Sequence, residues 1–291
     1  MRALSGAPLK VAMIVVAASS LVGCSRYNNL KALKFFKNAN KAYQAQDYRE
    51  AAKLYQESLE ADENAAPPAH FFLANSLEQI YRPSRKGEPQ NDQLLVDAVK
   101  HYQLAADKLS ALPQEDAKKL GKLSLEYLVA AYGPDKLADP AKAEPVVQKM
   151  IQMEPAEPAN YFALAKIYED AAYYNEAEQM LLYAQKAAPS DAAVYLQLAG
   201  FYNRQGEFPK TIEALNQRAE KEPSNPEAFQ TIAGFYWDET TKNGRLTPAE
   251  KKDYTTKGLA AVEKALSLRT DYVEAIAFKG LLLRLEANQE K

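Results

Sequence analysis

Small, aromatic and proline residues recur along this chain at an interval of 34 positions. Alanines open the series, tyrosines stand three positions after most of them, and prolines close the units. The members are Ala131, Ala165, Ala199 and Ala233, then Tyr168, Tyr202 and Tyr236, then Pro155, Pro189 and Pro223. A fixed period of this length is typical of helical units that stack on their neighbours. The pattern therefore predicts an all-α fold.

The clearest unit, 158–191, shows how two helices would pair. Its first half has apolar residues at three- and four-residue spacing, which is typical of one buried helix face. These residues are Tyr161, Leu164 and Tyr168. Ala165 and Ala177 stand twelve positions apart, where two antiparallel helices would cross, and only small side chains allow the axes to approach closely. Pro189 ends the second helix because proline cannot continue the hydrogen-bond ladder.

These positions resemble the signature of the tetratricopeptide repeat. The resemblance covers about six units and a final helix that starts near Asp271. It implies an α-solenoid of antiparallel helix hairpins with a C-terminal capping helix, so residues 35–291 form one superhelical domain. Two units contain insertions, near 82–94 and 240–253. Within the second insertion, the Thr-Pro-Ala-Glu sequence at 247–250 predicts a capping box that opens a short helix.

In this family the first helix of each hairpin lines a concave groove that binds protein. By resemblance, the groove candidates are Phe36, Asn40, Tyr43, Phe71, Asn75, Phe162, Lys166, Asn203, Arg204 and Trp237. Neighbouring candidates on the same helices are Glu78, Leu128, Tyr132, Glu169, Gln230 and Asp238. This mixture of aromatic, amide and charged groups suits an extended peptide or a partner helix. For Trp237 two interpretations remain open, a groove anchor or a side chain packed under the insertion that follows it.

The first 23 residues have the pattern of a secretory signal. Arg2 and Lys10 precede a mainly apolar run at 11–23. A helix needs about 20 apolar residues to cross a bilayer, so this run is short for a membrane span. We expect residues 1–23 to be removed by cleavage.

The run ends in the sequence Leu-Val-Gly-Cys at 21–24, which resembles the lipobox of bacterial lipoproteins. The resemblance implies that Cys24, the only cysteine in the chain, is acylated and that residues 24–34 form a short tether. Ser25, where an aspartate would favour retention at the inner membrane, favours the outer membrane. An ordinary secretory signal with an incidental cysteine and an uncleaved anchor remain alternatives.

Composition and charge narrow the function classes. The chain has 36 Lys and Arg against 38 Asp and Glu, a net charge of −2, which argues against nucleic acid as the main partner. The sequence contains no Gly-rich phosphate loop, nucleophile elbow or metalloprotease motif, so we expect no enzyme, no cofactor and no small-molecule substrate. His70 and His101 fall in one hairpin and could approach each other, but nothing completes a metal-ligand spacing. Arg82, Arg85 and Lys86 form a small basic cluster, either a solvated loop or a contact for anionic head groups.

Together these patterns predict a bacterial lipoprotein, anchored in the outer membrane and facing the periplasm. Its repeats would bind protein partners as an adaptor or scaffold in the assembly or regulation of a cell-envelope machine. A carrier or chaperone for exported proteins is the alternative binding role. An enzyme would require an active site built in the insertions.

Overall fold

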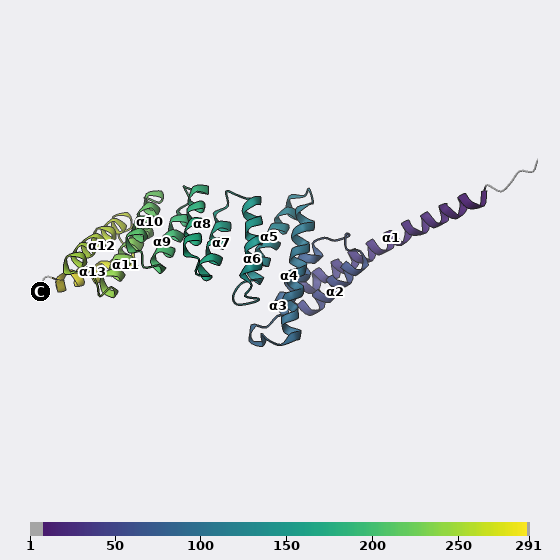
Figure 1. Cartoon of the computed structure of the whole chain (residues 1–291), viewed down its shortest axis with the longest axis horizontal. Helices are drawn as coiled ribbons and strands as arrows, with labels where there is room; N and C mark the ends of the chain where they lie inside the picture. The colour runs from purple at the N-terminus through teal and green to yellow at the C-terminus, as the bar shows by residue number, and fades with distance from the viewer. Residues whose placement is uncertain (1–7, 290–291) are drawn as a thin grey trace, which may run out of the picture. The chain divides into compact units, whose positions relative to one another are not determined.

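The structure, a computed structural model, describes the backbone of residues 8–289 and the side chains of residues 25–289. This part of the chain folds into thirteen α-helices and one short 3-10 helix, without strands (Figure 1). The helices of the N-terminal half are α1 (Pro8–Gln44), α2 (Tyr48–Ala61), α3 (Ala69–Ile80), α4 (Pro89–Ser110), α5 (Glu115–Ala131) and α6 (Pro140–Met153), with the 3-10 helix η1 (Pro83–Arg85) before α4. Those of the C-terminal half are α7 (Pro158–Asp170), α8 (Tyr174–Ala187), α9 (Ala192–Arg204), α10 (Phe208–Lys221), α11 (Pro226–Lys242), α12 (Pro248–Leu268) and α13 (Val273–Gln289). The predicted all-α fold of helix hairpins is confirmed.

The chain divides into two compact units, Met1–Met150 and Ile151–Lys291. Within each unit, consecutive helices pack side by side as hairpins, such as α1 with α2 in unit 1 and α7 with α8 in unit 2. The continuity of one domain over 35–291 stays a prediction.

Small side chains lie where the paired helices cross. Ala165 is 4% exposed and Ala177 is fully buried, as the sequence predicted. In the next hairpin Thr211 takes the second small position and is also fully buried, and its hydroxyl donates a hydrogen bond to the Glu207 carbonyl at 3.1 Å. The polar atom of this substitution is therefore satisfied inside the hairpin. In the last hairpin Gly258 takes this position, where an added Cβ would lie 3.2 Å from Tyr236 Cβ on the paired helix and 3.0 Å from the Leu282 side chain.

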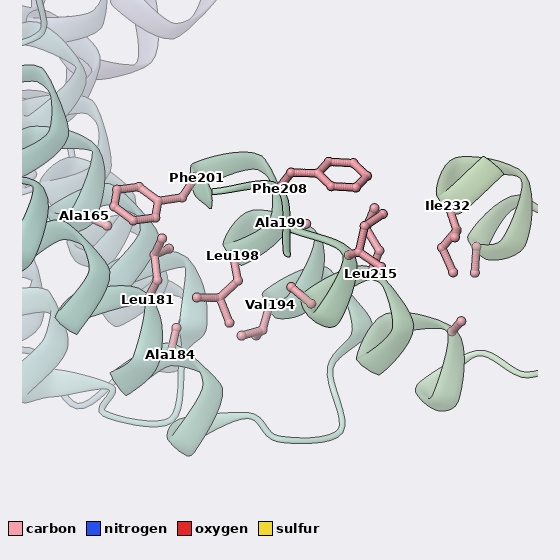
Figure 2. Close-up of a cluster of buried hydrophobic side chains, with 14 of the residues drawn as sticks. Ala165, Leu181, Ala184, Val194, Leu198, Ala199, Phe201, Phe208, Leu215 and Ile232 are labelled. Atoms are coloured by element: carbon pink, nitrogen blue, oxygen red, sulfur yellow. The ribbon is translucent and has the colours of Figure 1, made fainter. Parts of the chain in front are cut away.

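The largest core cluster of unit 2 joins successive hairpins. Figure 2 shows Leu181 of α8 close to Val194 and Leu198 of α9 in its interior. All three side chains are at most 4% exposed. Burial of a leucine or valine side chain contributes about 1.5–3 kcal/mol, so stacking of repeats supplies stability that one hairpin alone lacks.

The turns inside four hairpins share a left-handed residue at the same repeat position. Gly206 has φ +73°, and the equivalent residues Gln46, Ala138 and Ala172 have φ 60°, 54° and 61°. Glycine adopts this conformation without a steric penalty, whereas for other residues the left-handed backbone costs roughly 1–2 kcal/mol of conformational energy. The sequence predicted this turn only at Gly206.

Two elements differ from the sequence predictions. Thr247 and Glu250 do form a capping box, with the Glu250 N–H donating to Thr247 Oγ1 at 3.2 Å. The helix that they open is not short, however, because α12 continues for 21 residues to Leu268. Once a first turn is formed, each further residue adds a hydrogen bond, and no proline follows Pro248 in this helix.

The N-terminal segment also differs. Residues 25–34 of the predicted tether 24–34 are helical and belong to α1. Ten helical residues span about 15 Å, roughly half their extended reach. The side chains of the predicted signal 1–23 and of Cys24 lie outside the described residues.

Candidate binding surface

The exposed side of the first helices in unit 2 carries a hollow of about 660 Å³. It lies between α7 and α9, and its lining is entirely polar or charged apart from one tyrosine ring. The lining residues are Lys166, Glu169, Asp170, Tyr174, Gln197, Arg204 and Gln205. The hollow thus contains the predicted groove residues Lys166 and Arg204 and the neighbouring candidate Glu169.

A bidentate ion pair connects α7 and α9 across this hollow. Arg204 donates from Nε to Glu169 Oε1 at 2.7 Å and from Nη2 to Glu169 Oε2 at 2.9 Å. These hydrogen bonds raise the pKa of the Arg204 guanidinium, which therefore stays charged at every physiological pH. Gly200 leaves space for this side chain, because an added Cβ would lie 3.3 Å from Arg204 Nη1.

The remaining charges of the hollow are also paired. Lys166 donates to Asp170 one helical turn further along α7. The hollow therefore holds two cations and two anions, and its charge sums to zero. The amides of Gln197 and Gln205 add donors and acceptors of the kind that bind peptide main chain. The arrangement suits a polar segment with charges of both signs better than a strongly acidic or basic one.

Other predicted groove residues of unit 2 have different surroundings. Asn203 is exposed beside Arg204, and Phe162 is half-buried against the core cluster of Figure 2. Trp237 is half-buried, with its ring 6.1 Å from that of Phe278 on α13. The tryptophan thus packs beside the C-terminal helix.

In unit 1 the predicted groove residues form an internal polar network. Tyr43 donates to Asn75 Oδ1 at 2.7 Å, and Asn75 Nδ2 donates to the Tyr102 hydroxyl at 3.4 Å. Tyr102 donates to Glu78 Oε2 at 2.6 Å, and Lys136 donates to the other oxygen of Glu78. Burial and the carboxylate of Glu78 raise the pKa of Tyr102, which keeps its proton as a donor. The network joins α1, α3, α4 and the loop after α5.

This network corrects the prediction for two residues. Asn75 is 4% exposed and Phe71 is 5% exposed, because Tyr102 and Tyr127 cover them with rings centred 5.9 and 5.6 Å from the Phe71 ring. Both side chains therefore hold helices together and offer almost no surface to a partner.

The two remaining candidates of unit 1 also contact α2. Asn40 accepts a hydrogen bond from Tyr55 at 2.7 Å, and Phe36 packs against the Tyr55 ring at 5.8 Å. Burial raises the pKa of Tyr55, so its hydroxyl stays a donor. Phe36, Asn40 and Tyr43 are half-buried and retain part of their surface.

Sequence reasoning did not single out three polar residues of the hollow. Asp170 stands one position after Glu169, where the family pattern also places groove residues, and could have been found. Gln197 and Gln205 lie outside that pattern. Only the fold of unit 2, which places α9 across the hollow from α7, brings them there.

Within the described part of the chain, no cluster of three or more His, Cys, Asp and Glu residues suits a metal ion. No helix there is both long and apolar enough to span a bilayer.

No family model and no curated protein matches the chain. Among solved structures, the C-terminal part of a TPR repeat-containing protein from Cytophaga hutchinsonii is similar over 87% of this chain and 95% of that one, at 17% identity and a TM-score of 0.51. The fold is that of tetratricopeptide repeat proteins. A tetratricopeptide repeat protein from Parabacteroides merdae is similar over 87% of this chain and 99% of that one, at 13% identity and a TM-score of 0.47. The MamA protein is similar over 75% and 98%, at 15% identity and a TM-score of 0.47. These likenesses concern the tetratricopeptide repeat fold alone.

Proposed function

We propose that this chain is a lipid-anchored scaffold of the bacterial cell envelope. Its repeats bind protein partners at the surface formed by the first helices of the hairpins. The anchor is Cys24, and the body faces the periplasm from the outer membrane, where it serves the assembly or regulation of an envelope machine. The sequence at 21–24 and Ser25 support the location.

The observation that carries the binding role is the hollow between α7 and α9. Its Arg204–Glu169 pair spans two repeats and leaves the arginine 55% exposed, so a partner can reach the charge without unfolding either helix. Exposed arginine and glutamine groups on a fixed helical surface form hydrogen bonds with a docked segment at low entropic cost. The proposal assigns no reaction to the chain.

A photo-cross-linking experiment tests the binding role in living cells. A photoreactive amino acid at Gln205, inside the hollow, is expected to give discrete protein adducts, and Arg204→Glu is expected to abolish them. The matched control places the same group at Lys252, an exposed position of α12. Equal adducts at both positions, or adducts that survive Arg204→Glu in a folded protein, contradict the proposal. Adducts with many unrelated exported proteins favour a carrier over a scaffold.

Fractionation tests the anchor separately. Cys24→Ser is expected to release the protein from membranes and to remove metabolic acyl label, since the chain has no other cysteine. A variant that keeps its label refutes acylation at Cys24.

A further inference from the structure

The outward surface of α1 combines basic and apolar side chains. We define the outer face of α1 as its exposed residues between positions 26 and 41. The basic members are Arg26, Lys31, Lys34, Lys37 and Lys41, and the apolar members are Tyr27, Leu30 and Leu33. No Asp or Glu occurs between residues 25 and 46. The chain as a whole is slightly acidic, so this face is a local concentration of positive charge.

The opposite side of the helix fixes which way this face points. Ala32 and Ala39 are fully buried, and the Ala32 carbonyl accepts a hydrogen bond from Ser58 of α2 at 2.8 Å. Asn29 donates to Asp62 at 3.2 Å, just beyond the end of α2. Because α1 is held to α2 by these contacts, its outer face is directed away from the rest of unit 1.

The charges of the outer face have no acidic partner. Within the described residues, no ion pair involves any of the five basic side chains, although lysines elsewhere in unit 1, such as Lys108 and Lys149, are paired. The one charge contact recorded there is Lys31 Nζ, which lies 5.7 Å from the centre of the Phe35 ring. Five unpaired cations on one helix face are complementary to an anionic surface.

The apolar side chains of the outer face indicate which kind of anionic surface it would bind. Tyr27 and Leu30 are each 68% exposed, and Leu33 is 41% exposed. They lie among the lysines on the same side of the helix, at three-residue spacing. Nucleic acid or an acidic protein tail would leave the leucines in water. A lipid surface accepts them below its head groups while the lysine chains reach up to the phosphates.

We propose that the outer face of α1 lies on an anionic phospholipid surface. The inference extends the membrane attachment proposed above. A basic surface beside an acyl anchor supplies a second attachment signal. The face begins two residues after Cys24, so both signals would act at the same place. The basic loop residues Arg82, Arg85 and Lys86, which the sequence suggested for this role, have no exposed large hydrophobic side chain among them.

Vesicle co-sedimentation tests the inference with the full chain carrying Cys24→Ser, so that no acyl group contributes. The probes are vesicles of phosphatidylcholine alone and of equal parts phosphatidylcholine and phosphatidylglycerol. The variant is Lys34→Gln with Lys37→Gln and Lys41→Gln, which removes three charges and keeps good helix formers. The matched control, Lys53→Gln with Arg82→Gln and Lys86→Gln, removes three exposed charges of the same unit. The parent, the α1 variant and the control variant all contain the apolar run at 11–23, so it adds the same background binding to each.

Each basic residue near an anionic membrane strengthens binding about fivefold, so the α1 variant should bind phosphatidylglycerol vesicles on the order of 100-fold more weakly. The control variant should bind as the parent does. The difference should shrink when added salt reduces the screening length from about 10 Å to about 3 Å. Circular dichroism should remain that of the parent in both variants.

Three outcomes overturn the inference. They are the absence of a preference of the parent for phosphatidylglycerol, binding of the α1 variant as tight as that of the parent, and loss of binding by the loop control alone. Charge-dependent vesicle binding, combined with the absence of acyl label from the wild-type chain in cells, refutes the anchor alone. Loss of the charge-dependent binding with intact labelling refutes the role of α1 alone.

Discussion

The histidine pair in unit 1 makes a quantitative prediction about acid stability. His70 on α3 is 2% exposed, and its Nδ1 lies 2.9 Å from Nδ1 of His101 on α4. Only one proton fits between these atoms, so one ring donates and the other accepts. His70 Nε2 lies 3.6 Å from Glu63 Oε1, and Glu63 is paired with Lys108 at 3.1 Å. We therefore assign His101 as the donor, which leaves the Nε2–H of His70 facing the carboxylate.

This environment favours the neutral form of His70. Burial, followed by the proximity of His101, lowers the pKa of His70 from 6.5 to about 4. Burial also lowers the pKa of His101, which has Lys100 and Asp97 nearby. In the unfolded chain both rings take up a proton near their ordinary pKa. Below that pH the unfolded state binds protons that the folded state does not bind, so the free energy of unfolding falls.

The size of the effect follows from the shift of His70. One pKa unit corresponds to about 1.4 kcal/mol, so the full shift is worth about 3 kcal/mol once the pH has fallen to about 4. At about pH 5 the loss attributable to His70 is about 2 kcal/mol. The contribution of neutral His70 to the free energy of unfolding is fully present above pH 6.5 and is lost as the pH falls toward 4.

Paired urea unfolding experiments measure this contribution. His70→Asn removes the titrating ring and keeps an oxygen that can accept from His101. Because the lowered pKa of Glu63 also makes the parent sensitive to acid, the informative quantity is the difference between parent and variant. We expect the parent to lose about 2 kcal/mol more than the variant between about pH 7 and about pH 5.

Nuclear magnetic resonance provides an independent check. The chain contains only two histidines, so His101→Asn assigns the remaining ring signal to His70. A His70 signal that titrates near pH 6.5, or equal acid losses in parent and His70→Asn, refutes the reasoning.

Three further predictions concern the fold, and each is measured by chemical or thermal unfolding. Ala172→Gly should stabilise the protein by about 0.5–1 kcal/mol because φ is 61° there, and Gly206→Ala should destabilise it by about 1 kcal/mol; a loss from Ala172→Gly contradicts the account of the turn. Ala177→Leu should cost about 1–3 kcal/mol because the site is fully buried at a helix crossing, while the exposed control Leu182→Ala should change stability by about 0.5 kcal/mol or less. Tyr102→Phe should cost about 1–3 kcal/mol because it leaves Asn75 and Glu78 without their shared hydroxyl, and an unchanged unfolding midpoint would show that the network contributes nothing.

The sequence alone determined the hairpins and their local details. The period of 34 residues and the small pairs twelve positions apart predicted which residues meet inside a hairpin, and Ala165 and Ala177 lie buried as expected. Gly206 and the capping box of Thr247 and Glu250 were likewise predicted from neighbouring residues. Such features depend on spacing within one or two helices, and spacing fixes the face on which a side chain stands.

Only the tertiary structure decided which of those faces remain open. Phe71 and Asn75 stand at positions that resemble groove residues, yet Tyr102 from a different helix covers them. Glu169 and Arg204 are 35 positions apart and meet because the stacking of successive hairpins places α7 and α9 on opposite sides of the hollow. Burial of a side chain depends on residues from distant parts of the chain that pack against it, and the local sequence pattern does not specify those contacts. The periodicity therefore specified the repeats, and packing between helices determined which of their side chains remain accessible to a partner.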